Sequence, residues 1–236
     1  MVLLAKHLGE RRRRYSYRIL FIPATIGSIT WLSVNEARIS AIKHGFAVAG
    51  VGDKGAFTYK RSRHENAEID RVFSYVLANS KDGSKTIPFR PYGYDERQFC
   101  SPGFNLPVGC VMRTPFGEYP EYHTSADNLE FIRVNALEDS YHKCASALNI
   151  LDSNGVYLNQ NPKCEPQLGK RGLYQSVGGQ SHAKFDEMAI LWVLSLSDGS
   201  SSLLDIAERS GYSFETIKNA AQILLQSNLL KESSTV

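Results

Sequence analysis

The fold class follows from a short apolar run, Gly45-Phe46-Ala47-Val48-Ala49-Gly50-Val51. An unbroken apolar run of this length is typical of a strand that is buried on both faces of a sheet. Short runs of the same kind predict further strands at 17–22, 57–59 and 108–112. Because segments with helical spacing lie between these runs, we expect an α/β domain over residues 1–152, with a doubly wound, mostly parallel sheet.

The expected helices of this domain have apolar residues at helical spacing. They cover 2–8, 27–43, 67–78 and 134–151, and the segment 67–78 has the clearest amphipathic pattern. The loops between Pro88 and Glu130 are long and rich in aromatic residues. Ligands of α/β proteins bind outside the carboxyl ends of the strands, so these loops are the first place to look for a functional site.

The character of the chain changes after about residue 152. Residues 153–182 are rich in Gly, Asn, Gln and Pro, which predicts a linking segment. Residues 183–236 hold three short helical patterns (185–196, 202–210 and 213–225) and a tail at 228–231 that can supply a wing strand. The sequence therefore predicts a small winged-helix-like domain at the C-terminal end.

Composition excludes some classes of protein and disfavours others. The chain has 236 residues, a formal net charge of +3 and no apolar run that approaches the ~20 residues needed to span a bilayer. No segment resembles a signal-peptide core. The four cysteines form no Cys-x-x-Cys pair, which favours reduced thiols over a disulfide framework or a zinc ribbon. We therefore expect a cytoplasmic globular protein with no membrane association.

Two loop segments are dense in groups that can bind a metal or a substrate. The first is Arg90–Gly103 and contains Asp95, and the second is Gly117–Asn128 and contains His123. Carboxylate and imidazole ligands with one open position allow zinc to lower the pKa of a bound water. The plainer interpretation is that these side chains form loop hydrogen bonds and surface ion pairs, and spacing alone leaves both open.

Three motifs carry a resemblance to a known family. They are Asp95-Glu96-Arg97-Gln98-Phe99-Cys100-Ser101-Pro102-Gly103, then Glu118-Tyr119-Pro120-Glu121-Tyr122-His123-Thr124-Ser125-Ala126-Asp127-Asn128, then Cys164-Glu165-Pro166-Gln167-Leu168-Gly169-Lys170-Arg171-Gly172-Leu173-Tyr174. The chain resembles bacterial aminopeptidase-like proteins with a C-terminal winged helix, which are associated with polysaccharide biosynthesis. Their core is similar to zinc exopeptidases of the bacterial leucyl aminopeptidase type. The resemblance extends from Val2 to about Lys231.

The resemblance implies a zinc metallohydrolase that acts on a terminal amide or peptide bond. It nominates Asp95 and His123 as metal ligands. It also implies that Glu121 or Asp127 orients the ring of His123. The other residues that it implies to line the cleft are Arg97, Glu165 and Arg171; a structural ion pair is the alternative role of Glu165 and Arg171.

Two departures from the family argue against catalysis by this chain. Family members have an earlier His-x-x-His-Pro stretch and an Asn-Asp-Asn-Leu-Ser-Gly stretch, which supply a first histidine and a metal-bridging aspartate, and neither occurs here. The family also has a glutamate as general base where this chain has Ala24. We therefore predict no catalytic residue, and expect a fragment, a pseudoenzyme that binds without catalysis, or a chain that receives its missing segment from another chain.

Partners follow from the same arguments. We expect a peptide or amide small molecule in the cleft, and either self-association or a chain that supplies the missing segment, because a missing strand leaves an open sheet edge. The sequence disfavours nucleic acid. The four arginines 11–14 fit a solvated helix end, and the presumed reading helix, 213–218, holds Lys218 as its only cation, beside Glu215.

Overall fold

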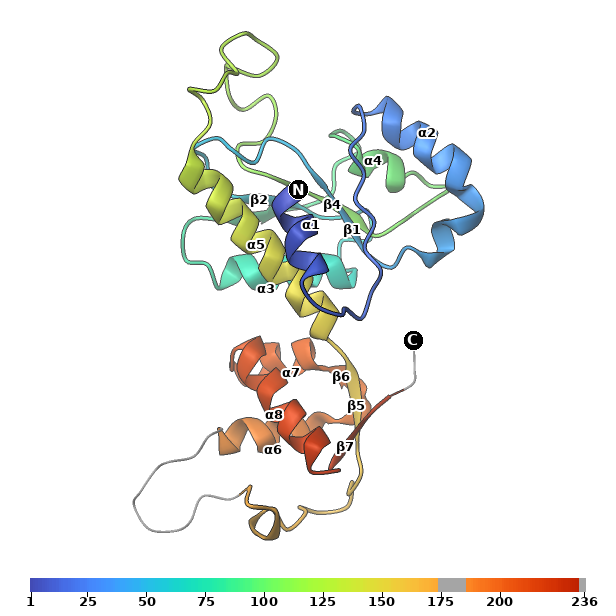
Figure 1. Cartoon of the computed structure of the whole chain (residues 1–236), viewed down its shortest axis with the longest axis vertical. Helices are drawn as coiled ribbons and strands as arrows, with labels where there is room; N and C mark the ends of the chain where they lie inside the picture. Colours follow the sequence, from blue (N-terminus) through green and yellow to red (C-terminus); the bar gives the residue numbers. More distant parts are fainter. Residues whose placement is uncertain (174–185, 234–236) are drawn as a thin grey trace. The chain divides into compact units, whose positions relative to one another are not determined.

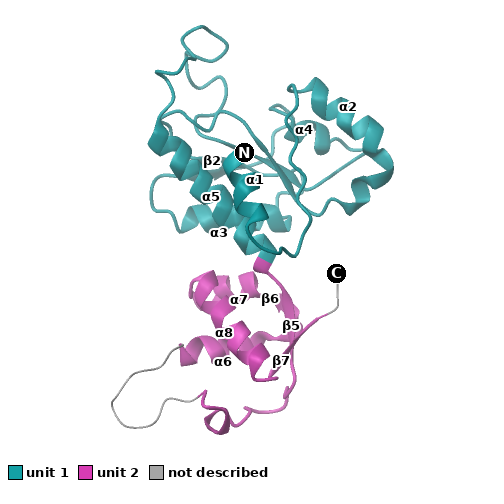
Figure 2. Ribbon diagram, viewed as in Figure 1, with its two compact units in different colours: residues 1–152 teal, residues 153–236 magenta. Residues whose placement is uncertain are grey.

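The computed structural model describes residues 1–173 and 186–233 (Figure 1). The chain forms two compact units, Met1–Asp152 and Ser153–Val236, which Figure 2 shows in separate colours. Each unit is built on its own sheet, one of four strands and one of three. Within the described ranges, no helix is both long enough and apolar enough to cross a membrane.

The first unit contains a four-stranded sheet in the order β1–β4–β2–β3. The strands are β1 (Gly45–Val48), β2 (Thr58–Lys60), β3 (Lys85–Ile87) and β4 (Val108–Met112). β1 runs parallel to β4 and β2 runs parallel to β3, whereas β2 and β4 are antiparallel. The predicted α/β class with a sheet rich in parallel pairs is therefore confirmed, with one antiparallel pairing at its centre.

β4 forms the core of this unit because each of its five residues is buried. The helix α3 (Glu68–Ala78) packs against β3 and β4 through its apolar face. The ring of Phe73 on α3 stacks on the buried ring of Tyr59 in β2, with 4.3 Å between centroids. The apolar run of β4 thus has the burial expected of a strand covered on both faces.

The remaining helices of the first unit are α1 (Val2–Gly9), α2 (Ile26–Asn35), α4 (Glu96–Phe99) and α5 (Val134–Ser153). The helix expected over 27–43 is divided, since α2 is followed by the 3-10 helix η1 (Glu36–Ala41). The helices expected over 2–8, 67–78 and 134–151 are confirmed.

The strand predicted at 17–22 is wrong for this structure. These residues form neither a helix nor a strand, and they belong to neither sheet. An extended apolar segment becomes a strand only when a neighbouring strand accepts its main-chain hydrogen bonds. The described residues give this segment no such neighbour.

The second unit has the arrangement of a winged helix. Its sheet has the order β6–β5–β7, with β5 (Val156–Asn159) antiparallel to both β6 (Asp198–Ser202) and β7 (Leu230–Glu232). The helices are α6 (Glu187–Leu196), α7 (Leu203–Ser210) and α8 (Phe214–Gln226), and the 3-10 helix η2 covers Gly169–Arg171. Ser202 and Ser213 cap α7 and α8 by accepting main-chain N–H bonds, as serine commonly does at helix starts.

The structure differs from the sequence-based prediction at the segment expected to link the units. Part of the expected linker 153–182 belongs to the second unit, because β5 is the central strand of its sheet. The main-chain N–H of Leu203 donates to Gly155 O (3.0 Å), and that of Leu204 donates to the Asn154 side chain (2.9 Å). Residues 174–182 of the expected linker lie outside the described residues, as do residues 183–185 and 234–236 of the domain expected at 183–236.

The thiols provide a test of the core. Cys100, Cys110 and Cys144 are buried and Cys164 is exposed, and all four are free. Burial raises the pKa of each buried thiol, that of Cys144 to about 12, which suppresses the reactive thiolate. A thiol reagent such as Ellman's reagent should therefore titrate one cysteine in the folded protein and four after denaturation. Cys164→Ser should abolish the rapid reaction, and a second fast thiol in the folded protein would contradict the packing.

Candidate functional site

Aromatic rings join the two loop segments that carry the predicted ligands. One segment follows β3 and leads to Asp95, and the other follows β4 and leads to His123. The rings of Tyr92 and Tyr94 each pack edge-on against Phe116, with 5.2 Å between centroids. Tyr94 also hydrogen-bonds Tyr122, and burial together with this bond raises the pKa of Tyr94. The structure therefore brings together the two segments, which are more than twenty residues apart in the sequence.

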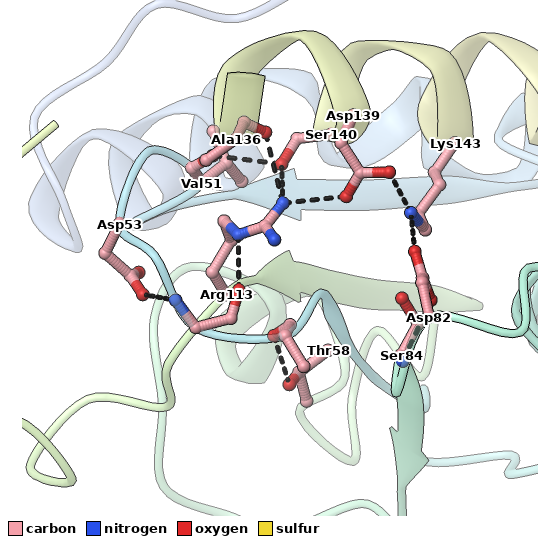
Figure 3. Close-up of polar contacts among 12 residues, drawn as sticks. Val51, Asp53, Thr58, Asp82, Ser84, Arg113, Ala136, Asp139, Ser140 and Lys143 are labelled. Atoms are coloured by element: carbon pink, nitrogen blue, oxygen red, sulfur yellow. Dashed lines mark hydrogen bonds and ion pairs between the residues drawn. The ribbon is translucent and has the colours of Figure 1, made fainter. Parts of the chain in front are cut away.

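Polar contacts fix the start of the second loop to the domain (Figure 3). The Arg113 guanidinium donates from Nε to Gly55 O (2.6 Å) and from Nη1 to the Asp139 carboxylate on α5 (2.8 Å). The neighbouring Thr114 hydroxyl donates to the Asp53 carboxylate (2.6 Å). The orientation of the loop at this end is thus set by groups from α5 and from the loop after β1.

The far end of the loop is held by a main-chain bond. The N–H of Arg133 donates to Gly52 O at 2.8 Å, just before α5 begins. Since Gly52 and Gly55 lie in the same short loop after β1, both ends of the segment 113–133 are attached to one anchor. This arrangement confines the segment that carries His123.

Asp95 stands at the start of α4 and is the most informative of the predicted ligands. Its side chain is half-buried, and its Oδ1 atom is buried without a hydrogen-bond partner among the described residues. A buried acceptor without a partner costs about 1–3 kcal/mol, so each such atom in a native structure calls for an explanation. A bound cation that the protein coordinates directly is one such explanation.

A buried ion pair holds the chain on both sides of Asp95. The Lys60 ammonium on β2 lies 2.5 Å from Glu96 Oε1 and donates to the carbonyls of Arg90 (3.1 Å) and Tyr92 (2.9 Å). The side chains of Lys60 and Glu96 are 2% and 0% exposed. The ammonium thus contacts residues before and after Asp95, through two hydrogen bonds and one ion pair.

Sequence reasoning missed this ion pair. The strand was expected over 57–59, so Lys60 fell just outside it. Glu96 is part of the first motif, but the motif assigns it no function. Cys110 is also next to Glu96, and burial, followed by the charge of Glu96, raises the pKa of its thiol. A lysine at the end of an apolar strand was the only signal that could have pointed to a buried charge.

His123 lies in a different environment. Its side chain is exposed, its backbone is left-handed (φ 58°), and its ring stacks on Tyr122 with 4.0 Å between centroids. Glu121 accepts hydrogen bonds from Thr124 through its main-chain oxygen, and Asp127 is exposed. In the described structure neither carboxylate is bonded to the His123 ring, so its orientation by Glu121 or Asp127 remains a prediction.

The other predicted residues lie at different places. The Arg97 guanidinium is 5.8 Å from the centroid of the Tyr92 ring, so it lies beside the aromatic rings near Asp95. Glu165 and Arg171 are exposed and belong to the second unit, where Arg171 donates to Gln167 O (3.2 Å). Ala24 precedes α2 and has no proton acceptor in its side chain.

The described residues alone do not form a complete metal site. Among them, no group of three or more His, Cys, Asp or Glu side chains is close enough together to hold a metal ion. A catalytic zinc takes three protein ligands and a water. The assignment of Asp95 and His123 as ligands therefore stays a prediction.

The second unit offers little positive charge to nucleic acid. Residues 153–236 contain seven Lys and Arg and eight Asp and Glu. On α8, Lys218 pairs with Glu215 at 3.0 Å. Phosphate contacts supply much of the affinity for DNA, and the expectation that the chain does not bind nucleic acid stays a prediction.

Known proteins resemble both units. Residues 1–154 match the family model "Domain of unknown function (DUF4910)", and residues 155–232 match a winged helix-turn-helix model. A Clostridium acetobutylicum protein named "Putative polysaccharide biosynthesis protein with aminopeptidase-like domain" is 50% identical over 231 residues, which are 98% of this chain and 53% of that protein.

Two solved structures are also similar. The crystal structure of a "putative peptidase" from Clostridium acetobutylicum has a TM-score of 0.89 and 47% identity, and the match covers 98% of this chain and 51% of that chain. An aminopeptidase from Aneurinibacillus sp. strain AM-1 has a TM-score of 0.44 and 16% identity over 54% of this chain and 30% of that chain, which is too slight a likeness to bear on the site.

The chain spans about half the length of the two Clostridium acetobutylicum relatives that it matches. The predicted resemblance to aminopeptidase-like proteins with a C-terminal winged helix is confirmed by these matches. The chain belongs to the DUF4910 family, with its family domain in residues 1–154 and a winged helix-turn-helix domain after it.

Proposed function

We propose that the first unit forms part of a peptidase site in which the Asp95 carboxylate is a zinc ligand. The observation that carries this proposal is the buried Oδ1 atom of Asp95, which has no partner among the described residues. A zinc ion bound to this oxygen would supply the interaction that the protein itself does not. Lys60 and Glu96 support the proposal because they hold the main chain on either side of that carboxylate.

His123 is the second ligand in this proposal. It lies on the loop that the aromatic rings join to the Asp95 segment, and its exposed ring nitrogens make no described hydrogen bond that would have to be broken. Glu121 and Asp127 would then orient the ring. Arg97 lies beside the rings, and its Nε atom is also buried without a described partner, so it can contact a bound substrate.

The substrate class in this proposal is a terminal amide or peptide bond. The name of the 50% identical relative, which refers to an aminopeptidase-like domain and to polysaccharide biosynthesis, supports this class. When bound, zinc would supply a water of lowered pKa. Asp95 and His123 are too few to complete the site and Ala24 offers no base, so in this proposal the residues of this chain bind the substrate without catalysing its hydrolysis.

Zinc titration of the full chain tests the assignment. Isothermal titration should show one weak site, and Asp95→Asn and His123→Ala should each lower its affinity about 10- to 100-fold, because the loss of a ligand removes a direct bond to the metal. Glu138→Gln, which changes an exposed carboxylate on α5, is the matched control and should leave the affinity unchanged. Equal affinity in all four proteins would contradict the proposal.

A further inference from the structure

Arg97 on α4 is a half-buried arginine whose charge is not balanced by any described group. Its Nε atom is buried and has no hydrogen-bond partner among the described residues, which also give its guanidinium no ion pair. Its described interaction is with the exposed ring of Tyr92, whose centroid is 5.8 Å from the guanidinium carbon. A guanidinium has five N–H donors and is always charged in proteins. Arg97 therefore holds donors that the described part of the chain does not use.

Three other half-buried arginines of the first unit behave differently. Arg13, Arg61 and Arg113 each donate to at least one main-chain carbonyl oxygen. In Arg13 and Arg113 the Nε atom is itself a donor, at 3.3 and 2.6 Å. Buried polar groups in native proteins nearly always have a partner, so an exception calls for an explanation. A ligand that accepts hydrogen bonds from Arg97 is such an explanation.

The carboxylates next to Arg97 in the sequence do not neutralise it. Glu96 is paired with the Lys60 ammonium at 2.5 Å. Asp95 has an Oδ1 atom that is buried without a described partner, and no described ion pair joins this carboxylate to Arg97. The guanidinium is therefore available to a negatively charged group that is not part of the described chain.

The turn that carries Arg97 is fixed on both sides. The Glu96 side chain, directly before it, is 0% exposed and belongs to the buried ion pair. Cys100 follows α4: its N–H donates to Glu96 O (2.9 Å), and its buried thiol donates to Val108 O on β4 (3.2 Å). A donor on a fixed main chain loses less conformational freedom when a ligand binds. The position of Arg97 thus favours recognition of a ligand over a mobile surface charge.

We propose that Arg97 binds a carboxylate of the substrate, so that the amide bound at this site belongs to an acidic molecule. The planar guanidinium presents parallel N–H groups that match the two oxygens of a carboxylate. This inference rests on the proposed function, because it names a feature of the substrate of that site. Asp95 would hold the metal there, and Arg97, two residues further along the chain, would hold the carboxylate.

A carboxylate fits this position better than a phosphate group does. The loop segment Gly117–Asn128, which aromatic rings join to the segment before Arg97, contains Glu118, Glu121 and Asp127 and no lysine or arginine. A phosphate monoester has a charge of about −1.5 to −2 at pH 7. One guanidinium would leave part of that charge unbalanced beside an acidic segment, whereas it balances the single charge of a carboxylate.

The nuclear magnetic resonance signal of the Arg97 Nε–H group tests the inference directly. It is assigned in the full chain, freed of metal by dialysis, as the arginine signal that Arg97→Gln lacks. The probe is N-acetylglycine, an amide with a carboxylate, and the comparison compound is N-acetylglycinamide, which has a similar shape and no charge. N-acetylglycine should shift the signal to saturation and bind at least 10-fold more tightly, about the value of one charged hydrogen bond. Equal affinities, or no shift, would overturn the inference.

Variants separate bidentate binding from a point charge and from a structural role. Arg97→Lys keeps the charge without the planar group and should weaken N-acetylglycine binding about 10-fold, and Arg97→Gln should abolish the preference for it. Arg38→Gln, at an exposed arginine on η1, is the matched control and should bind like the parent chain. All three should keep the circular dichroism spectrum of the parent chain. Loss of that spectrum in both Arg97 variants would give Arg97 a structural role and overturn the inference.

Further probes distinguish the source of the carboxylate. Glucuronate has its carboxylate on a sugar, so tighter binding of glucuronate than of N-acetylglycine at Arg97 would support the inference with an acidic sugar as the source. The reverse order would support it with an amino-acid carboxylate as the source. Tighter binding of inorganic phosphate than of both would overturn the choice of carboxylate.

The titrations also separate the inference from the proposed function, because they use protein without metal. A preference for carboxylate at Arg97, together with unchanged zinc affinity in Asp95→Asn, would leave the inference standing and contradict the metal assignment. Reduced zinc affinity in Asp95→Asn without any preference for carboxylate at Arg97 would support the metal assignment and overturn the inference.

Discussion

Lys60→Met is expected to lower the free energy of unfolding by about 3–5 kcal/mol. The substitution leaves the Glu96 carboxylate buried without its counter-charge, and removal of one partner from a buried ion pair has a cost of this size. It also leaves the carbonyls of Arg90 and Tyr92 without their donor. Urea denaturation followed by circular dichroism measures the loss, and the zinc affinity at Asp95 should fall in parallel because its flanking residues are released.

Two further variants show whether charge is the cause. Lys54→Met removes an exposed lysine in the loop after β1 and should change the stability by less than about 0.5 kcal/mol. Adding Glu96→Gln to Lys60→Met should restore part of the loss, since the second substitution removes the unpaired charge. A loss below about 1 kcal/mol in Lys60→Met would mean that the pair contributes little and that Asp95 is held by other contacts.

Arg113→Met is expected to cost about 2–4 kcal/mol and to release the loop that carries His123. The guanidinium is the shared donor to Gly55 on one side and to Asp139 on α5 on the other, so its loss removes charged hydrogen bonds from both (Figure 3). Hydrogen exchange of residues 115–133 should accelerate more than that of α3.

The matched control for this substitution is Arg38→Met. Arg38 is exposed on η1, so this variant loses the same side chain at a position that does not connect the loop to α5. It should leave both the stability and the exchange of the loop unchanged. Equal acceleration in the loop and in α3 would mean that Arg113 stabilises the whole unit and does not act on the loop in particular.

The local sequence pattern was sufficient to predict an element when the element packs against other parts of the same chain. The apolar run 108–112 was predicted with its observed bounds, because the strand is buried on both faces and directly follows Pro107. The helix over 67–78 was predicted to within one residue because its apolar spacing matches the face that it buries. In both cases the sequence pattern and the tertiary contact favour the same structure.

The strands that the sequence did not predict are strands because they pair with a neighbouring strand. β3 (Lys85–Ile87) is short and partly polar, and it is a strand because it lies beside β2. β6 begins at Asp198-Gly199, which indicates a turn, yet it pairs with β5. Conversely, 17–22 has a strand pattern and no described partner. A propensity for strands is a local property, whereas membership of a sheet depends on residues far away in the sequence.

The candidate site was predictable only in part. The motifs identified Asp95 and His123, but the unpartnered state of Asp95 Oδ1 depends on the packing around α4, which no local pattern describes. The ion pair of Lys60 and Glu96 connects residues that are far apart in the sequence. Contacts between such distant residues become visible only in the folded chain.

The unpaired segment 17–22 has a consequence for the amount of protein in a cell. Extended apolar segments with free main-chain groups are the features through which chains aggregate, and cells remove chains that expose such segments by means of chaperones and proteases. A chain with Phe21 exposed next to such a segment should therefore be short-lived by itself.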